Sequence, residues 1–156
     1  YGGRSGRHEQ RVVMSTEDVI SKDVGGLTAK VQEYERVLKQ VAATAQKPGF
    51  GRADWAPLAE LVAVDEFERV GIWRNTMKWP EYVDMLTEFT KANAFESSGQ
   101  RIAEAGGRVF FDREERHIEG DTVHVVNAMS VYEFDAGGKV RHLDVYIQGQ
   151  PGPKAR

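Results

Sequence analysis

Residues 131–148 read VYEFDAGGKVRHLDVYIQ, and this stretch predicts two antiparallel strands joined by a short turn. The segment Ala136-Gly137-Gly138 supplies the turn, because glycine adopts backbone conformations that other residues avoid. On both sides of the turn, β-branched and aromatic residues recur, and these residue types are enriched in strands. The end of the chain is therefore expected to be a β-hairpin.

The same pattern of strands and turns extends backwards from this hairpin. Glycine-containing turns recur at Gly106-Gly107 and Glu119-Gly120. They divide the second half of the chain into four expected strands, at 97–105, 107–118, 121–135 and 139–149. Consecutive strands with such short turns pair antiparallel.

Helical patterns occupy the first half of the chain. Apolar residues recur every three or four positions from Leu27 to about Ala45, which predicts an amphipathic helix. Asp54 and Pro57 favour the start of a short second helix that runs to about Leu61, and a third is expected from Trp79 to about Asn93. Between the last two, residues 62–71 (VAVDEFERVG) have β-type patterning. Helices followed by a long antiparallel sheet predict an α+β fold.

Length and composition favour one domain. The chain has 156 residues, of which 40% are hydrophobic, enough to bury one core. We expect this domain to span residues 15–150. The glycine- and arginine-rich residues 1–14 predict a disordered arm, and residues 151–156, which contain two prolines, predict a disordered tail.

The charge and residue content exclude several classes of partner. A net charge of −3 gives no general attraction to nucleic acid or anionic membranes. The chain has no cysteine and only four histidines, which lack the HxH and HExxH spacings, so neither a metal nor another cofactor is expected. No apolar run approaches the ~20 residues that cross a bilayer. With no signal peptide evident, we expect a cytoplasmic protein.

Residues 111–117 read FDREERH, an unusual density of charge for a strand. With Glu119-Gly120 as the turn, we expect Phe111 opposite Ala128, and with Ala136-Gly137 as the next turn, Ser130 opposite Leu143. Alternation then places one set of side chains on a common face. That face holds Val109, Phe111, Arg113, Glu115, His117, His124, Val126, Ala128, Ser130 and Tyr132, and the last strand adds Leu143, Val145 and Ile147.

The opposite face of the same strands also mixes apolar and charged residues. It holds Phe110, Asp112, Glu114 and Arg116 beside Val123, Val125, Met129, His142, Asp144 and Tyr146. A sheet with one side in water should alternate more cleanly, so both faces are expected to be covered. The helices can cover one face, and a second copy of the chain is the simplest cover for the other, which predicts a homodimer.

Three helices followed by such a sheet resemble the nuclear transport factor 2-like superfamily, which includes ketosteroid isomerases, limonene epoxide hydrolases, scytalone dehydratases and SnoaL-like polyketide cyclases. The resemblance covers roughly residues 27–149 and is most specific in the hairpin of residues 131–148, where Phe134-Asp135 and Gly138-Lys139-Val140 match the family's terminal hairpin. It implies a cone-shaped roll with the helices packed in a strongly curved, mostly antiparallel sheet.

The resemblance also implies roles for particular residues. In VQEY, Tyr34 matches the oxyanion-hole tyrosine of ketosteroid isomerases, and in FERVG, Glu68 matches their catalytic base. Ser130 stands where those enzymes have a protonated aspartic acid. Arg113 and Glu115 match the arginine-x-aspartate pair of the epoxide hydrolases.

The expected function is binding of a small, largely apolar molecule in a central cavity, with isomerisation, dehydration or hydrolysis by acid-base chemistry. The cavity would be lined by Phe111, Val126, Ala128, Tyr132, Leu143, Val145, Ile147, Trp73 and Trp79. Simpler structural interpretations remain open for the charged and polar residues, because ion pairs at strand spacing are common on surfaces. Ligand carriage without catalysis and a role in protein assembly are the alternative functions.

Overall fold

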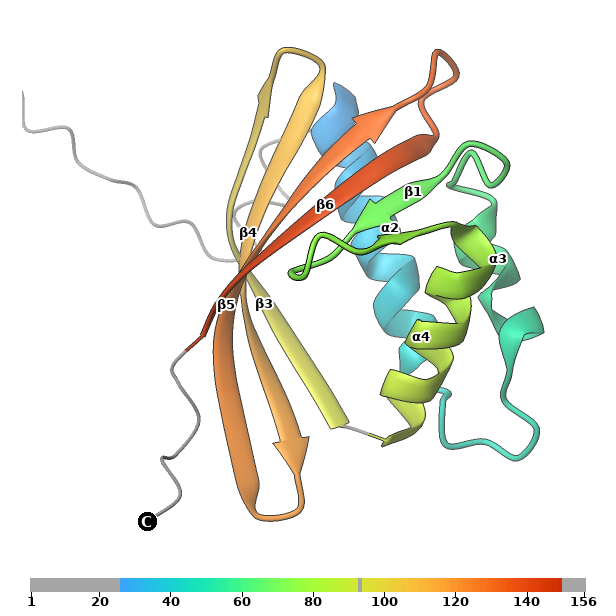
Figure 1. Ribbon diagram of the computed structural model, residues 1–156, viewed down its shortest axis with the longest axis vertical. Coiled ribbons are helices and arrows are strands. Elements are labelled where there is room, and N and C mark those ends of the chain that lie inside the picture. Colours follow the sequence, from blue (N-terminus) through green and yellow to red (C-terminus); the bar gives the residue numbers. More distant parts are fainter. Residues whose placement is uncertain (1–25, 93, 150–156) are drawn as a thin grey trace, which may run out of the picture.

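The computed structural model describes residues 26–92 and 94–149, which form three α-helices and one six-stranded sheet (Figure 1). This confirms the predicted α+β class. The arm and the tail expected at the two ends lie outside the described residues. None of the described helices is both long and apolar enough to span a membrane.

The first described helix, α2, spans Gly26–Ala42 and buries one side. Its buried apolar residues recur at helical spacing, as expected: Val31, Tyr34, Val37 and Val41. The helix ends a few residues before the predicted boundary, because the chain turns after Val41. The amide of Thr44 donates to the carbonyl of Val41, one residue short of the α-helical spacing.

The predicted second helix is split into a 3₁₀ turn, η1 at Arg52–Trp55, and a short helix, α3 at Ala56–Ala59. The Asp54 carboxylate accepts a hydrogen bond of 2.8 Å from the Gly51 amide at the start of this segment. Two short strands follow, β1 at Glu68–Val70 and β2 at Thr76–Met77. The last helix, α4, spans Trp79–Ala92, within a residue of its prediction.

Four longer strands complete the chain: β3 at Ala94–Ala105, β4 at Arg108–Glu119, β5 at Thr122–Phe134 and β6 at Val140–Gly149. The spatial order in the sheet is β2-β1-β6-β5-β4-β3. All neighbours pair antiparallel except β1 and β6, which are parallel. The sheet is therefore mixed and mostly antiparallel.

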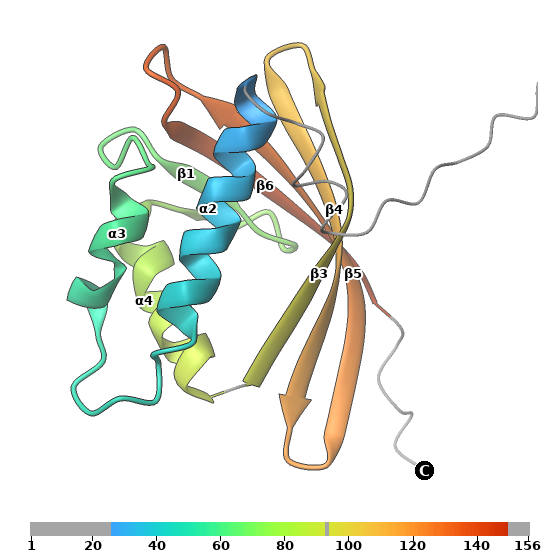
Figure 2. The ribbon, with the colours of Figure 1, turned by 180° about the vertical axis from the view of Figure 1, so that it is seen from behind.

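Helices α2, α3 and α4 all lie on one side of the sheet (Figures 1 and 2). We call this side the inner face and the opposite side the outer face. The inner face contributes to the hydrophobic core through Val109, Phe111, Tyr132, Leu143 and Val145, all of which are buried. These are residues that alternation in the sequence assigned to one face.

The turn between β4 and β5 differs from the prediction by one position. Glu119 lies opposite Thr122, so Gly120 and Asp121 are the central residues of the turn. Gly120 has a φ of 58°, and a type II′ turn needs glycine at the first central position. Every partner across this hairpin therefore shifts by two residues, with Phe111 opposite Ser130.

A similar shift affects the last hairpin, where Ser130 lies opposite Val145 and not Leu143. Here the loop closes between Asp135 and Lys139, because the Asp135 amide donates to the Lys139 carbonyl at 2.8 Å. A shift by two residues leaves each side chain on the face that was predicted for it. The predicted pairs were wrong, and the predicted faces are those of the structure.

Candidate functional site

Arg113 is the central charged residue of the inner face. Its side chain is only 11% exposed, and it lies on β4. Its Nε donates to Oε1 of Glu115 at 2.7 Å, and its Nη1 donates to the hydroxyl oxygen of Ser130 at 2.6 Å. The guanidinium thus joins β4 to β5 through the hydrogen bond to Ser130, while the bond to Glu115 stays within β4.

Glu115 connects Arg113 to a histidine at the end of this cluster. Its second oxygen, Oε2, lies 3.0 Å from Nε2 of His117. The His117 ring packs against Phe89 of α4, with the ring centroids 5.2 Å apart. Both oxygens of the Glu115 carboxylate are therefore engaged, and Glu115 itself is buried.

The charges around Arg113 keep it protonated. Burial on its own would lower the pKa of Arg113, because a charged group loses hydration there. The negative charge of Glu35, with contributions from Tyr132 and Glu115, outweighs this effect and raises the pKa above its ordinary value. Arg113 is a permanent buried cation.

A second buried carboxylate, Glu35, enters the inner face from α2. It is 8% exposed, and its Oε1 accepts a hydrogen bond from the hydroxyl of Tyr132 on β5. Burial raises the pKa of Tyr132 well above its ordinary value, and the negative charge of Glu35 raises it further. Tyr132 therefore remains a neutral hydrogen-bond donor to Glu35.

Two further tyrosines extend the polar cluster towards α4. The Tyr34 hydroxyl donates to the Tyr82 oxygen at 3.3 Å, and the Tyr34 ring meets the Tyr132 ring edge to face, with centroids 5.5 Å apart. Burial raises the pKa of Tyr34 well above its ordinary value. Tyr34 is consequently a neutral hydrogen-bond donor, like Tyr132.

One buried hydroxyl of the cluster lacks a partner among the described residues. Ser97 of β3 lies opposite Glu115, and its Oγ is buried without a hydrogen bond to any described group. The Lys39 ammonium approaches the same residue but donates to its backbone carbonyl at 3.0 Å. An unsatisfied buried hydroxyl beside a carboxylate is a position at which a bound molecule gains a hydrogen bond.

We name this set of residues the inner polar cluster: Tyr34, Glu35, Tyr82, Ser97, Arg113, Glu115, His117, Ser130 and Tyr132. Four of the five residues predicted to act catalytically belong to it, namely Tyr34, Arg113, Glu115 and Ser130. Their proximity was expected from the alternation of the strands and from the resemblance. Their catalytic roles remain predictions.

Glu68 does not join them. In the parallel pairing of β1 with β6, Glu68 lies beside His142, whose side chain belongs to the outer face. The Glu68 side chain is 42% exposed and is bonded at 2.8 Å to the Lys78 ammonium. That hydrogen bond lowers the pKa of Glu68. We expected Glu68 to point into the inner polar cluster, but the strand register places its side chain on the outer face. The next residue, Arg69, faces inwards instead.

The predicted apolar lining lies mostly on the inner face. Phe111, Ala128, Tyr132, Leu143 and Val145 are buried there, whereas Val126 is half-buried and Ile147 is 40% exposed. Trp73 is 85% exposed in the β1–β2 connection, so it does not wall the inner face as expected. His124 lies opposite His117 but is exposed.

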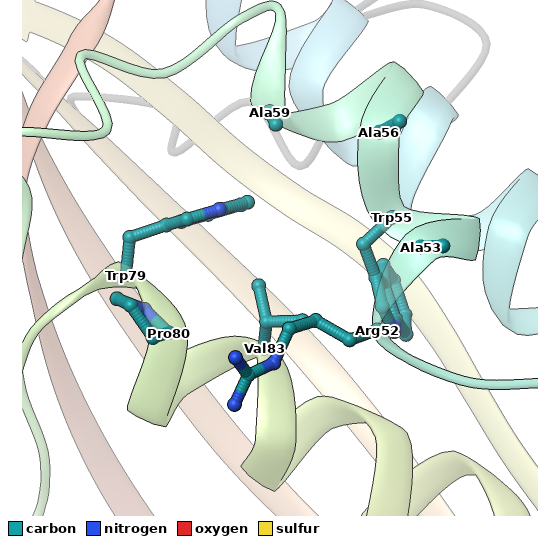
Figure 3. Close-up of a pocket in the computed structure, with 8 residues that line it drawn as sticks. All are labelled: Arg52, Ala53, Trp55, Ala56, Ala59, Trp79, Pro80 and Val83. Atoms are coloured by element: carbon teal, nitrogen blue, oxygen red, sulfur yellow. The ribbon is translucent and has the colours of Figure 1, made fainter.

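Trp79 lines a small pocket between α4 and the η1–α3 segment. Its volume is about 160 Å³, and it is lined by Arg52, Ala53, Trp55, Ala56, Ala59, Trp79, Pro80 and Val83. Figure 3 shows the indole of Trp79 and the Val83 side chain flanking this space. Trp79 also contacts Tyr82, with centroids 6.0 Å apart, so the pocket adjoins the inner polar cluster through aromatic side chains.

Sequence reasoning missed Glu35. A signal was present, because Val31, Glu35 and Leu38 follow the i, i+4, i+7 spacing of one helix face. An acidic residue in an apolar stripe is expensive to bury unless a partner is provided.

No group of three or more histidine, aspartate or glutamate side chains among the described residues is arranged to hold a metal ion.

Several solved structures share this architecture. An LEH-like epoxide hydrolase of M. tuberculosis is 17% identical, with a TM-score of 0.54 over 75% of this chain and 84% of that one. An NTF2-like protein of unknown function from Exiguobacterium sp. 255-15 is 16% identical, with a TM-score of 0.58 over 78% and 99% of the two chains. A SnoaL-like polyketide cyclase from Jannaschia sp. CCS1 is 8% identical, with a TM-score of 0.54 over 75% and 86%.

No family model matches the chain, and no curated protein matches it by sequence. The likeness is therefore one of structure. The chain has the nuclear transport factor 2-like fold, as the terminal hairpin and the order of helices and strands led us to expect.

Proposed function

We propose that this protein binds a small, largely apolar molecule against the inner face and isomerises, dehydrates or hydrolyses it by acid-base chemistry without a cofactor. The observation that carries the proposal is the buried Arg113, bonded to Glu115 and Ser130 among core residues. Burying such charges is costly, and buried ionisable clusters are concentrated at functional sites. The cone-shaped roll expected from the resemblance would enclose the ligand between the sheet and α2.

Ser130 and Arg113 would stabilise negative charge on the ligand. Because the Ser130 oxygen accepts a hydrogen bond from Arg113, its own O–H remains available to donate. A ligand carbonyl, hydroxyl or epoxide oxygen placed there would receive that hydrogen bond next to a fixed positive charge. Preorganised donors of this kind lower the free energy of a transition state in which the oxygen becomes negative.

Glu35 is the carboxylate best placed to move a proton. Glu115 has both oxygens engaged, by Arg113 and His117, and therefore orients the cation. The described residues provide Glu35 with one hydrogen bond, from Tyr132 to Oε1, which leaves Oε2 to accept a proton from a ligand. The two carboxylates thus have different surroundings and different proposed roles.

Similar folds support this class of chemistry without defining the reaction. The structural neighbours include proteins described as an epoxide hydrolase, a polyketide cyclase and an epoxide hydrolase/cyclase-like enzyme. At these identities the likeness concerns the fold alone, and fold does not determine activity. Carriage of the same ligand without turnover is the alternative function.

A binding screen followed by a turnover assay tests the proposal. Steroids, terpenoid epoxides and polyketide-like aromatics would be screened by thermal shift, and each binder would be incubated with the protein and analysed by mass spectrometry. Glu115→Gln and Glu35→Gln are expected to remove turnover, whereas Glu114→Gln, the matched outer-face control on β4, should retain it. Binding without turnover in the wild type would favour carriage, and the absence of any binder would contradict the proposal.

The outer face is the proposed homodimer interface. It exposes Val123, Val125 and Tyr146 at 49%, 43% and 61%, respectively, among residues of neighbouring strands. The charged residues of this face pair within the chain, for example Glu114 with Arg116 at 3.1 Å. An apolar patch surrounded by satisfied ion pairs is typical of surfaces that associate.

A further inference from the structure

Arg69 places a second guanidinium on the inner face. It lies on β1 next to Leu143 of β6, in the register that turns Glu68 outwards. Its guanidinium carbon lies 5.4 Å from the centroid of the Tyr82 ring, within the range of a cation–π interaction. The Arg69 side chain therefore points towards α4 and is half-buried.

A glycine leaves room for this guanidinium. Gly71 is buried, and a Cβ added to it would lie 3.0 Å from Nη1 of Arg69 and 2.9 Å from Oδ1 of Asn75. Only a residue without a side chain accepts these neighbours without displacing them. The Arg69 guanidinium thus lies near both the Tyr82 ring and the bare backbone of Gly71.

Arg69 has no carboxylate partner among the described residues. The neighbouring acid, Glu68, is bonded to Lys78 on the outer face. On the inner face, Glu115 is engaged by Arg113 and His117, and Glu35 is engaged by the Tyr132 hydroxyl. Among the described residues, the guanidinium of Arg69 contacts the ring of Tyr82.

The surroundings of Arg69 are aromatic. Tyr82 stacks on Phe67, with centroids 5.4 Å apart, and Phe67 in turn meets Trp79 at 5.3 Å. Burial raises the pKa of Tyr82, and the positive charge of Arg69 opposes that rise. A half-buried cation in such a setting is stabilised when an anion binds and neutralises its charge.

We infer that Arg69 binds the carboxylate of an apolar monocarboxylic acid, and that such acids are the substrate class of the inner-face site. The planar guanidinium matches a carboxylate in a two-pronged hydrogen bond, and one cation matches one negative charge. The aromatic residues Phe67, Trp79 and Tyr82 would contact the apolar body of the acid. This inference rests on the proposed function, because it names the ligand of the same site.

The test compares acids with their uncharged amides on the whole chain. The probes are 2-naphthoate with 2-naphthamide, cinnamate with cinnamamide, and decanoate with decanamide, titrated calorimetrically at low ionic strength. Within at least one pair, the acid is expected to bind about tenfold more tightly than the amide, the typical worth of a charge-assisted hydrogen bond. This comparison uses the wild type and does not depend on the folding of a variant.

Variants then locate the preference. Arg69→Gln should reduce the ratio of the association constants of acid and amide to near one, without weakening the binding of the amide. Gly71→Ala should also reduce this ratio, because the added methyl group displaces the guanidinium. Arg74→Gln is the matched control, because Arg74 is an exposed arginine in the β1–β2 connection, five residues after Arg69. Each variant would be checked for its fold by circular dichroism.

The outcomes separate this inference from the proposed function. Amides that bind as tightly as their acids, or a preference that survives Arg69→Gln, would overturn the role of Arg69 and leave the inner-face site intact. If Arg74→Gln alone abolished the preference for the acid over the amide, the carboxylate would bind outside the inner face. This result would also overturn the role of Arg69. If neither member of any pair binds while other apolar compounds do, the acid class is wrong; if no compound binds, the proposed function itself fails.

Discussion

The hydroxyl of Tyr132 in β5 donates a hydrogen bond to the carboxylate of Glu35 in α2, two residues that are 97 positions apart in the sequence. Both residues are buried, so this bond ties the helix to the centre of the sheet through the core. It also brings the negative charge of Glu35 close enough to Arg113 to raise the pKa of that guanidinium. The same pair therefore contributes to the fold and to the electrostatics of the candidate site.

Removing the Tyr132 hydroxyl is expected to destabilise the protein. Tyr132→Phe leaves the buried Glu35 carboxylate without its donor, which should lower the free energy of unfolding by about 1–3 kcal/mol. Urea denaturation measures the change. Tyr146→Phe is the control, because Tyr146 is 61% exposed, and it should change stability by less than about 0.5 kcal/mol. Equal effects of the two changes would contradict a structural role for this hydrogen bond.

Removing the buried cation should have a larger effect. Arg113→Met keeps the apolar volume but leaves Glu115 with His117 as its remaining described partner, and breaking a buried pair on one side costs about 3–5 kcal/mol. Arg116→Met, on the outer face of the same strand, breaks an exposed ion pair worth about 0–1 kcal/mol. Chemical denaturation of both variants checks this difference. Similar losses would mean that Arg113 is not buried with Glu115 as described.

These interior residues show what could be predicted from the sequence. Alternation along β4, β5 and β6 placed Phe111, Arg113 and Ser130 on one face, because side chains in a strand alternate whatever the pairing partner is. The pairs themselves were wrong by two residues, since the pairing depends on which position of a turn the glycine occupies. Gly120 sits at the first central position, a detail that composition alone does not define.

The edge of the sheet was harder to predict than its centre. Strand β1 has three residues, too few for alternation to show which side chains face the helices, and its parallel pairing with β6 has no signal in local sequence. Glu68 and Arg69 were therefore easily exchanged between the two faces. Glu35 was overlooked for another reason: its partner Tyr132 comes from the other half of the chain, and a helix pattern alone does not reveal the partner that permits burial.

Alkaline pH is expected to weaken the fold through the buried tyrosines. Burial raises the pKa of Tyr34, Tyr82 and Tyr132 above the ordinary value of about 10. Above that pH the unfolded chain releases these protons while the folded chain retains them, so the stabilisation that is present below pH ~10 is lost as pH rises. Each such tyrosine contributes a slope of about 1.4 kcal/mol per pH unit in that range.

Denaturation at several pH values between about 9 and 11 measures this slope, and Tyr34→Phe provides the comparison. Phenylalanine cannot ionise, so the variant should lose stability with pH less steeply than the wild type, by the contribution of one tyrosine. The direction of the difference matters more than its size, because the tyrosines of the cluster interact. An unchanged slope in Tyr34→Phe would show that this tyrosine ionises in the folded protein at its ordinary pH.

The outer face gives the last prediction, which concerns assembly. Val125→Asp puts an added charge in the proposed dimer interface, where desolvating a carboxylate opposes association. Sedimentation velocity at micromolar concentration should show a dimer for the wild type and a monomer for the variant. Val64→Asp is the matched control, because Val64 is 38% exposed compared with 43% for Val125 but lies in the connection between α3 and β1, outside strands β4–β6. A wild-type monomer, or a Val125→Asp dimer as stable as the control, would leave the apolar outer face without the partner that its exposed valines and tyrosine suggest.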